Sequence, residues 1–308
     1  MIDSERVNFI ILNLLHLLTP APAPDETGAV SETILDSHCH AWRTWPYPPL
    51  VPDEASRGTI EQLVYEMDVH GVDQAAVVCA AIENNPDNVE YVSFARARYP
   101  GRIKVIADLD CTWHQTYHRA GSADRLRGLD DRYELAGFTH YVAPENDGWL
   151  ASDGAEELFT AAEERGLLVS LAAGPAWQAD LRAVARRHPG VPILCHHLGG
   201  VSAAGDPAGL RQLVESVSCP NIYVKVSGFH YASSRGWDHP WPDAVQLFRR
   251  IFEAFGPDRL CWASDFPAST RHCTYRQSLE VVRTHCAFLS ADDRTRILGG
   301  TLRAILDR

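Results

Sequence analysis

The sequence has no run of Lys and Arg residues that could form a basic face, and its formal net charge is −12 over 308 residues. Nucleic-acid binding depends on such a face, so we expect no nucleic-acid partner. An acidic surface mainly keeps a protein soluble. It does not exclude an anionic substrate, because a few Arg side chains inside a pocket can locally outweigh the global field.

The eight cysteines form no C-x-x-C pair, and five of them lie in or beside apolar, strand-like runs. This pattern predicts reduced, packed thiols in a cytoplasmic protein. Cys39 lies between His38 and His40. Because alternate residues of a strand point to opposite faces, we expect its thiol to point away from both imidazoles.

Outside the body of the chain, the one strongly apolar stretch is residues 7–18, which is too short to span a bilayer. Two acids and one Arg precede it, unlike the basic start of a secretory signal. We expect no membrane association. Residues 1–31 are interpreted as an N-terminal extension, an apolar helix followed by a Pro-rich linker, or as residues added by an upstream start. Residues 32–308 then form one domain.

That domain shows no internal repeat and no linker after residue 34, and short β-branched runs alternate in it with stretches of helical period. Helices are expected at residues 59–71, 88–101, 154–166, 177–190, 275–289 and 291–308. Strands are expected at residues 34–40, 73–80, 102–110, 135–142, 167–173, 191–199, 222–228 and 260–267.

Eight strands, each followed by a helix, predict an α/β fold of the closed (β/α)8 TIM-barrel type. The rival is an open, doubly wound sheet, which is expected to carry a Gly-rich phosphate loop after its first strand. Here the first strand ends in H-C-H-A-W-R, without glycine. A single barrel is therefore the better prediction.

Polar residues fall where strands of a barrel end and face the active-site mouth. His38 and His40 end the first strand, and their spacing puts both imidazoles on one side, within reach of one metal ion or one substrate group. Asp265 ends the last strand, where a carboxylate can bind metal, hold a water molecule or act as a general base. The alternative for Asp265 is a cap of the following turn.

Four further polar residues lie on three other strands. His196 and His197 are adjacent, so regular strand geometry allows only one of them to face the mouth, and the other should pack outward. Lys225, on the seventh strand, is expected to bind substrate. His140 lies on the fourth strand.

Seven tryptophans lie in segments expected to follow strands, which suggests a partly apolar pocket for a ring-like substrate. Trp42 is expected to contact the substrate. Arg43, Arg235 and Arg271 lie in the same loops and could clamp a carboxylate. The alternative is that these residues are ordinary loop residues exposed to solvent.

Four motifs occur in a characteristic order: I-L-D-S-H-C-H-A-W, C-H-H-L-G-G, V-K-V-S-G and W-A-S-D-F-P. Together they resemble the amidohydrolase superfamily, in its amidohydrolase-related, lactonase-like branch. That group includes sugar-acid and dicarboxylate lactonases and relatives of aromatic-acid decarboxylases. The resemblance implies that His38, His40, His197 and Asp265 are the catalytic residues. His196 stands where many relatives have Asp.

Metal-dependent members of this group usually add a ligand on the fourth or fifth strand. The fifth strand here reads L-V-S-L-A-A, with no His, Lys or Glu, although His140 could substitute. His38, His40 and Asp265 remain as a two-histidine, one-carboxylate set that suits one divalent ion, zinc by preference. A mechanism without metal is equally open.

We therefore predict a hydrolase that acts on an ester-like bond of a small molecule, a lactone of a sugar acid or dicarboxylic acid. Asp265 activates water, while His38 and His40 polarise the carbonyl. One rival is a metal-dependent, non-oxidative decarboxylase of an aromatic or muconate-type acid. Another is a non-catalytic ligand-binding barrel. A homo-oligomer is compatible with all three.

Overall fold

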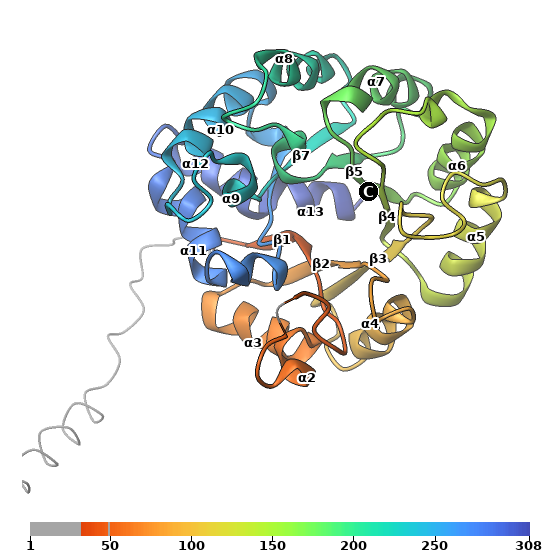
Figure 1. Cartoon of the computed structure of the whole chain (residues 1–308), viewed down its shortest axis with the longest axis horizontal. Helices are drawn as coiled ribbons and strands as arrows, with labels where there is room; N and C mark the ends of the chain where they lie inside the picture. The colour runs from red at the N-terminus through yellow and green to blue at the C-terminus, as the bar shows by residue number, and fades with distance from the viewer. Residues whose placement is uncertain (1–31, 49) are drawn as a thin grey trace, which may run out of the picture. The chain divides into compact units, whose positions relative to one another are not determined.

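A computed structural model of the protein describes residues 32–48 and 50–308, of which Thr33–Arg308 form one compact unit. The predicted N-terminal extension, residues 1–31, lies outside the described residues. Eight parallel strands follow one another around the unit in chain order (Figure 1). They are β1 (Leu35–Cys39), β2 (Gln74–Cys79), β3 (Ile103–Asp108), β4 (Gly137–Tyr141), β5 (Leu168–Ala172), β6 (Ile193–Cys195), β7 (Ile222–Val226) and β8 (Leu260–Trp262).

Helices alternate with these strands and form a ring outside them, which confirms the predicted (β/α)8 barrel (Figure 1). Two π-helical turns, Val281–His285 and Arg296–Gly300, lie between helices near the end of the chain. The α-helices are α2 (Glu54–Arg57), α3 (Ile60–His70), α4 (Asn88–Arg96), α5 (Ser122–Tyr133), α6 (Asp153–Glu164), α7 (Gln178–Arg187), α8 (Pro207–Glu215), α9 (Phe229–Ala232), α10 (Pro242–Phe255), α11 (Tyr275–Glu280), α12 (Ala291–Thr295) and α13 (Thr301–Leu306).

Local chemistry explains where the helices begin and end, as α3 illustrates. The Thr59 side chain accepts a hydrogen bond from the backbone N–H of Gln62, which caps the first turn. Gly71 ends the helix at φ 69°, a left-handed conformation that glycine adopts without steric cost. The helix buries Leu63 and Met67 against the barrel.

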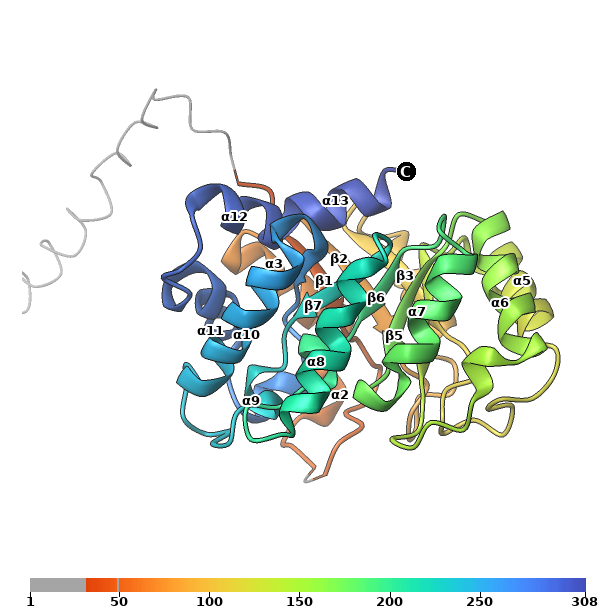
Figure 2. The same ribbon diagram turned by 90° about the horizontal axis from the view of Figure 1, so that it is seen from above.

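The strands contribute to two apolar clusters, one inside the barrel and one between the barrel and its helices. The outer cluster is the larger one and includes most of the buried helix residues. The inner cluster is closed at one end by Leu302 and Ile305 of α13, and α2 and α9 lie at the opposite end (Figure 2). Strand residues of the inner cluster are Leu35, Ala76, Val78, Ile106, Leu168, Leu194, Tyr223 and Cys261.

Side chains two positions apart on a regular strand share a face, so the residues of the inner cluster identify which other side chains face inward. Since Ile106, Leu168, Leu194 and Tyr223 are inner residues, side chains two positions farther along the same strands also point into the barrel. Those positions are polar, and they lie toward the carboxyl ends of the strands. They are Asp108, Ser170, His196 and Lys225.

All eight cysteines are buried free thiols, as expected. Among the described residues, no helix is long and apolar enough to cross a membrane.

Gly137 begins β4 at a point of close backbone approach. A methyl group there would run into the carbonyl oxygen and side chain of Leu168 on β5. We predict that Gly137→Ala lowers the free energy of unfolding by about 1–3 kcal/mol, as overpacking does. Gly128, exposed on α5 with open space around it, is the control. Gly128→Ala should raise stability by up to about 1 kcal/mol. Urea unfolding measures both, and equal effects would contradict the close approach.

Candidate active site

The two histidines of β1 face the barrel interior because the strand is irregular. Leu35 belongs to the inner cluster and Cys39 to the outer one. In a regular strand both would share a face. The register with β2 shifts between Asp36 and Cys39, and this irregularity reverses the alternation. His38 and His40 consequently point inward, and Cys39 points outward as predicted.

Asp36 ties β1 to the segment that follows β8. Its Oδ1 accepts hydrogen bonds from the backbone N–H groups of His38 and Ser264, both at 3.0 Å. The Tyr275 hydroxyl donates to Oδ2 at 3.1 Å. Beside this carboxylate, the backbone N–H of Asp265 donates to the carbonyl of His38 at 2.8 Å. These bonds fix the position of Asp265 relative to His38.

The carboxylate of Asp265 lies among three imidazoles. Its Oδ1 is 3.5 Å from Nε2 of His38 and 3.7 Å from Nε2 of His40. Nε2 of His197 is 3.9 Å from the same oxygen. The other oxygen, Oδ2, accepts a hydrogen bond from the Tyr231 hydroxyl at 3.0 Å. Oδ1 is therefore the oxygen that faces the imidazoles.

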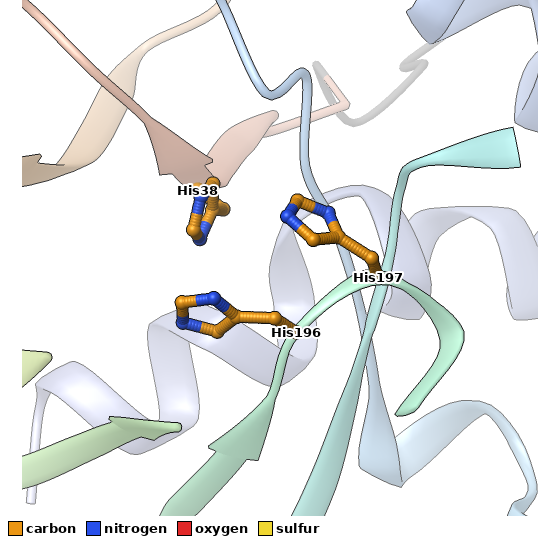
Figure 3. Close-up of side chains that lie close together, drawn as sticks. All are labelled: His38, His196 and His197. Atoms are coloured by element: carbon orange, nitrogen blue, oxygen red, sulfur yellow. The ribbon is translucent and has the colours of Figure 1, made fainter. Parts of the chain in front are cut away.

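Both histidines that follow β6 reach the same place. The strand ends at Cys195, and the chain then turns through His197 and Leu198, whose φ angles are 43° and 53°. The turn directs His196 and His197 toward His38 (Figure 3), and one ring nitrogen from each of the three lies within 4.8 Å of the others. The expectation that one histidine packs outward is wrong, because the strand has ended before His197.

Lys225 lies beneath the histidines rather than at the mouth. It is 1% exposed, and its Nζ donates to Ser170 Oγ at 2.7 Å and lies 2.9 Å from Nδ1 of His38. Ser170 Oγ is in turn 2.7 Å from Nε2 of His196. The predicted substrate contact of Lys225 is not supported by this depth. Its contacts suit a role in orienting His38 and, through Ser170, His196.

Burial dominates the electrostatics of the cluster, because removal from water disfavours every charged form. It raises the pKa of Asp265 to about 7, although the Tyr231 hydrogen bond opposes the rise. It lowers the pKa of His40 to about 4 and that of His197 to about 3. It also lowers the pKa of Lys225 to about 7. Near neutral pH the imidazoles are neutral, while Asp265 and Lys225 can each exchange a proton.

The donor atoms of His38, His40 and Asp265 fit one divalent ion. The Nε2 atoms of the two histidines are 3.2 Å apart, and each lies 3.5–3.7 Å from Asp265 Oδ1. Zinc bonds of about 2.0–2.2 Å in tetrahedral geometry separate neighbouring ligand atoms by roughly such distances. His40 Nδ1 lies 2.7 Å from the carbonyl of Val78, which can only accept, so Nε2 of His40 carries a free lone pair.

Two arrangements of protons are consistent with these contacts. Without an ion, a Lys225 ammonium donates to Nδ1 of His38, and the Nε2–H of His38 donates to Nε2 of His40. With an ion on both Nε2 atoms, His38 must carry its proton on Nδ1, and Lys225 must accept it as a neutral amine. The residues therefore fit zinc when Lys225 is deprotonated.

Two of the residues predicted to bind substrate, Arg43 and Trp42, are engaged in other contacts. Arg43 lies 3.7 Å from Asp87 and over the ring of Tyr91, among residues of α4 and the loop before it, which gives its proposed clamp no support. Trp42 is fully buried and stacks on His40 at 4.7 Å, so it supports the imidazole rather than offering a free surface.

Arg271 is the best placed of the three predicted clamps. Its guanidinium lies over Tyr47 at 5.9 Å, and Tyr47 packs edge-on against Trp42 at 5.4 Å. Arg235 lies 3.8 Å from Asp238 within its own loop. A series of ring contacts therefore connects Arg271 to His40: the guanidinium lies over Tyr47, Tyr47 contacts Trp42, and Trp42 stacks on the imidazole of His40.

Most of the seven tryptophans are packed inside the loops, and one of them, Trp45, also lines a cavity together with Arg271. Trp113 and Trp237 are exposed, and the other five are buried. The buried ones are Trp42, Trp45, Trp149, Trp177 and Trp241. His140 does not join the cluster: its Nδ1 donates to the carbonyl of Leu109 at 2.9 Å, and its Nε2 meets His118. It cannot supply the ligand that the fifth strand lacks.

Several residues of the site carried little signal in the sequence. Asp36 stands two positions before His38, although the irregularity of β1 puts their side chains on different faces, and Ser227, whose Oγ lies 2.9 Å from Nδ1 of His197, stands two positions after Lys225. Both spacings could have indicated them. Ser170 and Tyr231 have no distinguishing pattern, because their roles depend on contacts across the barrel.

An eight-stranded parallel barrel with histidines at the ends of β1 and β6 and an aspartate after β8 defines a TIM-barrel protein with an enzyme-like site. Residues 35–308 match the amidohydrolase family, and the chain belongs to it. Family membership confirms the predicted resemblance and supports the prediction of a hydrolase.

Among curated proteins, the chain is similar to L-fucono-1,5-lactonase of Burkholderia ambifaria, with 27% identity over 164 residues. The match covers 50% of this chain and 55% of that lactonase, so the chain spans about half the length of this relative.

Solved structures share the fold. A probable 2-pyrone-4,6-dicarboxylic acid hydrolase from Acinetobacter baumannii, with citric acid bound, has a TM-score of 0.69 and 19% identity over 90% of this chain and 100% of that one. An amidohydrolase from Burkholderia multivorans with bound zinc has the same TM-score and identity, over 89% and 99% of the two chains. A 2,6-dihydroxybenzoate decarboxylase from Rhizobium has a TM-score of 0.60 and 14% identity, over 90% and 99%.

The raised pKa of Asp265 makes stability depend on pH. Its folded-state pKa of about 7 lies above the ordinary value of 3.8, so ionising the folded protein costs stability that accumulates as pH rises between those values. Asp265→Asn removes this cost. We predict that its stability advantage over wild type grows by about 2 kcal/mol from pH 5 to pH 7.

Urea unfolding in the presence of a chelator measures this difference. The matched control is Asp206→Asn, because Asp206 is an exposed helix cap that Asn replaces well. A stability difference between Asp265→Asn and wild type that stays constant over this pH range would show that the carboxyl is not held in a desolvated site.

Proposed function

We propose that the protein hydrolyses an ester-like bond, specifically a lactone of a sugar acid or a dicarboxylic acid. The observation that carries this proposal is the buried Asp265 carboxylate with Oδ1 facing the imidazoles of His38, His40 and His197. Membership of the amidohydrolase family and the similarity to a curated lactonase support it.

In this mechanism Asp265 is the general base. Oδ1 accepts a proton from water as the water oxygen bonds to the lactone carbonyl carbon. The bond between that carbon and the ring oxygen then breaks, and the alkoxide takes the proton back from Asp265. The Tyr231 hydrogen bond to Oδ2 holds the carboxylate so that Oδ1 faces the reacting water. A pKa of about 7 suits a group that both takes and returns a proton.

The imidazoles have different capacities. With Lys225 donating to its Nδ1, His38 carries a proton on Nε2 and can donate to the carbonyl oxygen, which stabilises the developing oxyanion. Before a carbonyl oxygen binds, this same Nε2–H donates to Nε2 of His40, whose own proton is on Nδ1 and is donated to the carbonyl of Val78. His197, whose side chain is 22% exposed, is the imidazole of this set nearest to solvent and is suited to hold the incoming water.

His38, His40 and Asp265 would hold zinc if the ion is present. Bound there, zinc would act as a Lewis acid toward the carbonyl oxygen. The zinc-containing Burkholderia multivorans structure shares the fold and supports testing this possibility.

The functional experiment is a screen of sugar-acid and dicarboxylic-acid lactones, followed by acid release at constant pH, with carbon dioxide measured on aromatic acids in parallel. We predict lactone hydrolysis by the wild type, and losses in kcat of about 10²–10⁴-fold for Asp265→Asn and for His197→Gln. Asp206→Asn serves again as the control and should remain at wild-type activity. Carbon dioxide release without lactone hydrolysis would support the decarboxylase instead. No turnover of either class would favour a binding protein.

Metal content is measured independently of turnover. We predict that protein stripped with chelator and supplied with zinc binds one equivalent, and that His40→Gln binds none after dialysis. Binding should weaken below about pH 7. Zinc needs the Nε2 lone pair of His38, so His38 must carry its proton on Nδ1, and only a neutral Lys225 amine, whose pKa is about 7, can accept that hydrogen bond. Equal zinc retention by wild type and His40→Gln would rule out this ligand set.

A further inference from the structure

We propose that His196 is a further catalytic residue, whose Nδ1–H donates a hydrogen bond to the ring oxygen of the lactone. The inference rests on the proposed function for the identity of that oxygen. The donor itself follows from hydrogen bonds within the barrel, and it gives a role to a residue that the mechanism above leaves unused.

The proton position of His196 is set by its neighbours. Lys225 Nζ donates to Ser170 Oγ at 2.7 Å. It keeps an N–H for this bond whether it donates to His38 or accepts from it. The Ser170 hydroxyl keeps one hydrogen to donate, and Nε2 of His196, 2.7 Å away, can accept it, so we assign the hydroxyl as the donor of this bond. A neutral imidazole that accepts at Nε2 carries its proton on Nδ1.

That N–H has no acceptor among the described residues. His196 is 3% exposed, and its Nδ1 is buried without a hydrogen-bond partner. Its ring lies beside that of His38 (Figure 3), at 4.3 Å between ring centroids. The Tyr141 ring is 5.0 Å from that of His196. Buried donors are normally paired, so an N–H beside the reacting groups is explained by an acceptor on the ligand.

The acceptor is best identified as the leaving oxygen. Asp265 approaches His38 from the β8 side, and His196 approaches it from the β6 side. The attacking water and the ring oxygen both bond to the carbonyl carbon. The side chains that contact these two oxygens must therefore lie on either side of that carbon. No proton moves from His196: Asp265 supplies the proton of the alkoxide, and Nδ1–H stabilises the charge that builds as the bond breaks.

The tautomer can be tested without any substrate. Protein labelled with ¹⁵N-histidine is examined by NMR, and the His196 signal is identified by its loss in His196→Asn. We expect the Nδ1–H tautomer in wild type and in Ser216→Ala, a matched variant in which a different buried serine loses its hydroxyl. Ser170→Ala should shift His196 toward Nε2–H. An Nε2–H tautomer in wild type overturns the proposal, even if lactones are hydrolysed.

Kinetics then test the catalytic role. Asn places an amide N–H near the Nδ1 position, whereas Leu fills similar space without a donor. We expect His196→Leu to lose about 10²-fold in kcat with little change in KM, and His196→Asn to stay within about 10-fold of wild type. The Ser170→Ala substitution should lower kcat more when it is made in wild type than when it is made in the His196→Asn variant. Equal losses for the Leu and Asn variants, both shown to be folded, would indicate a merely structural role.

Lactones with different leaving groups show whether His196 donates to the ring oxygen or to the carbonyl oxygen. The loss in His196→Leu should be smaller for an enol lactone, whose leaving oxygen needs little stabilisation, than for an alkyl lactone. The same loss on both substrates would place the hydrogen bond elsewhere and overturn the assignment. If wild type hydrolyses no lactone, the proposed function fails, while the NMR result still decides whether His196 presents a donor.

Discussion

The site depends on the hydrogen-bonded seam between β1 and the segment after β8. Asp36 accepts from the backbone of His38 on one side and of Ser264 on the other, and the Asp265 N–H bonds directly to the His38 carbonyl. Groups 227 residues apart in the chain are thereby held within a few ångströms. Because the bonds are buried, breaking one leaves a desolvated polar group unpaired, which makes the arrangement rigid. Catalytic groups need such fixed geometry.

Burial has a second consequence, since it sets the charge state of the cluster. For Asp265, desolvation raises the pKa and the Tyr231 hydrogen bond lowers it, and desolvation is the larger effect. The carboxylate is thus a stronger base than it would be in water. The same burial keeps His38, His40, His196 and His197 neutral, so each imidazole has one donor and one acceptor. Lys225 connects them from below, as a single residue that contacts both His38 and Ser170.

The barrel could be predicted from sequence because alternating apolar runs and helical segments are a local signal, and the strand ends carried His38, His40, His197 and Asp265. Other features depend on backbone details that no local pattern encodes. The β1 irregularity and the left-handed turn at His197 decide which side chains face inward. Their position in loops predicts Trp42 and Arg43 as pocket residues, yet Trp42 is packed on His40 and Arg43 interacts with α4. The depth of Lys225 likewise follows from packing alone.

A crystal structure of the Asp265→Asn variant with an unreacted lactone bound tests the proposed site most directly. We expect the carbonyl carbon beside the side chain at position 265, between the imidazoles of His38 and His197, with the ring oxygen toward His196. A lactone bound only elsewhere, for example in the cavity of about 760 Å³ lined by Lys104 and Ile305 at the α13 end of the barrel, would contradict this placement.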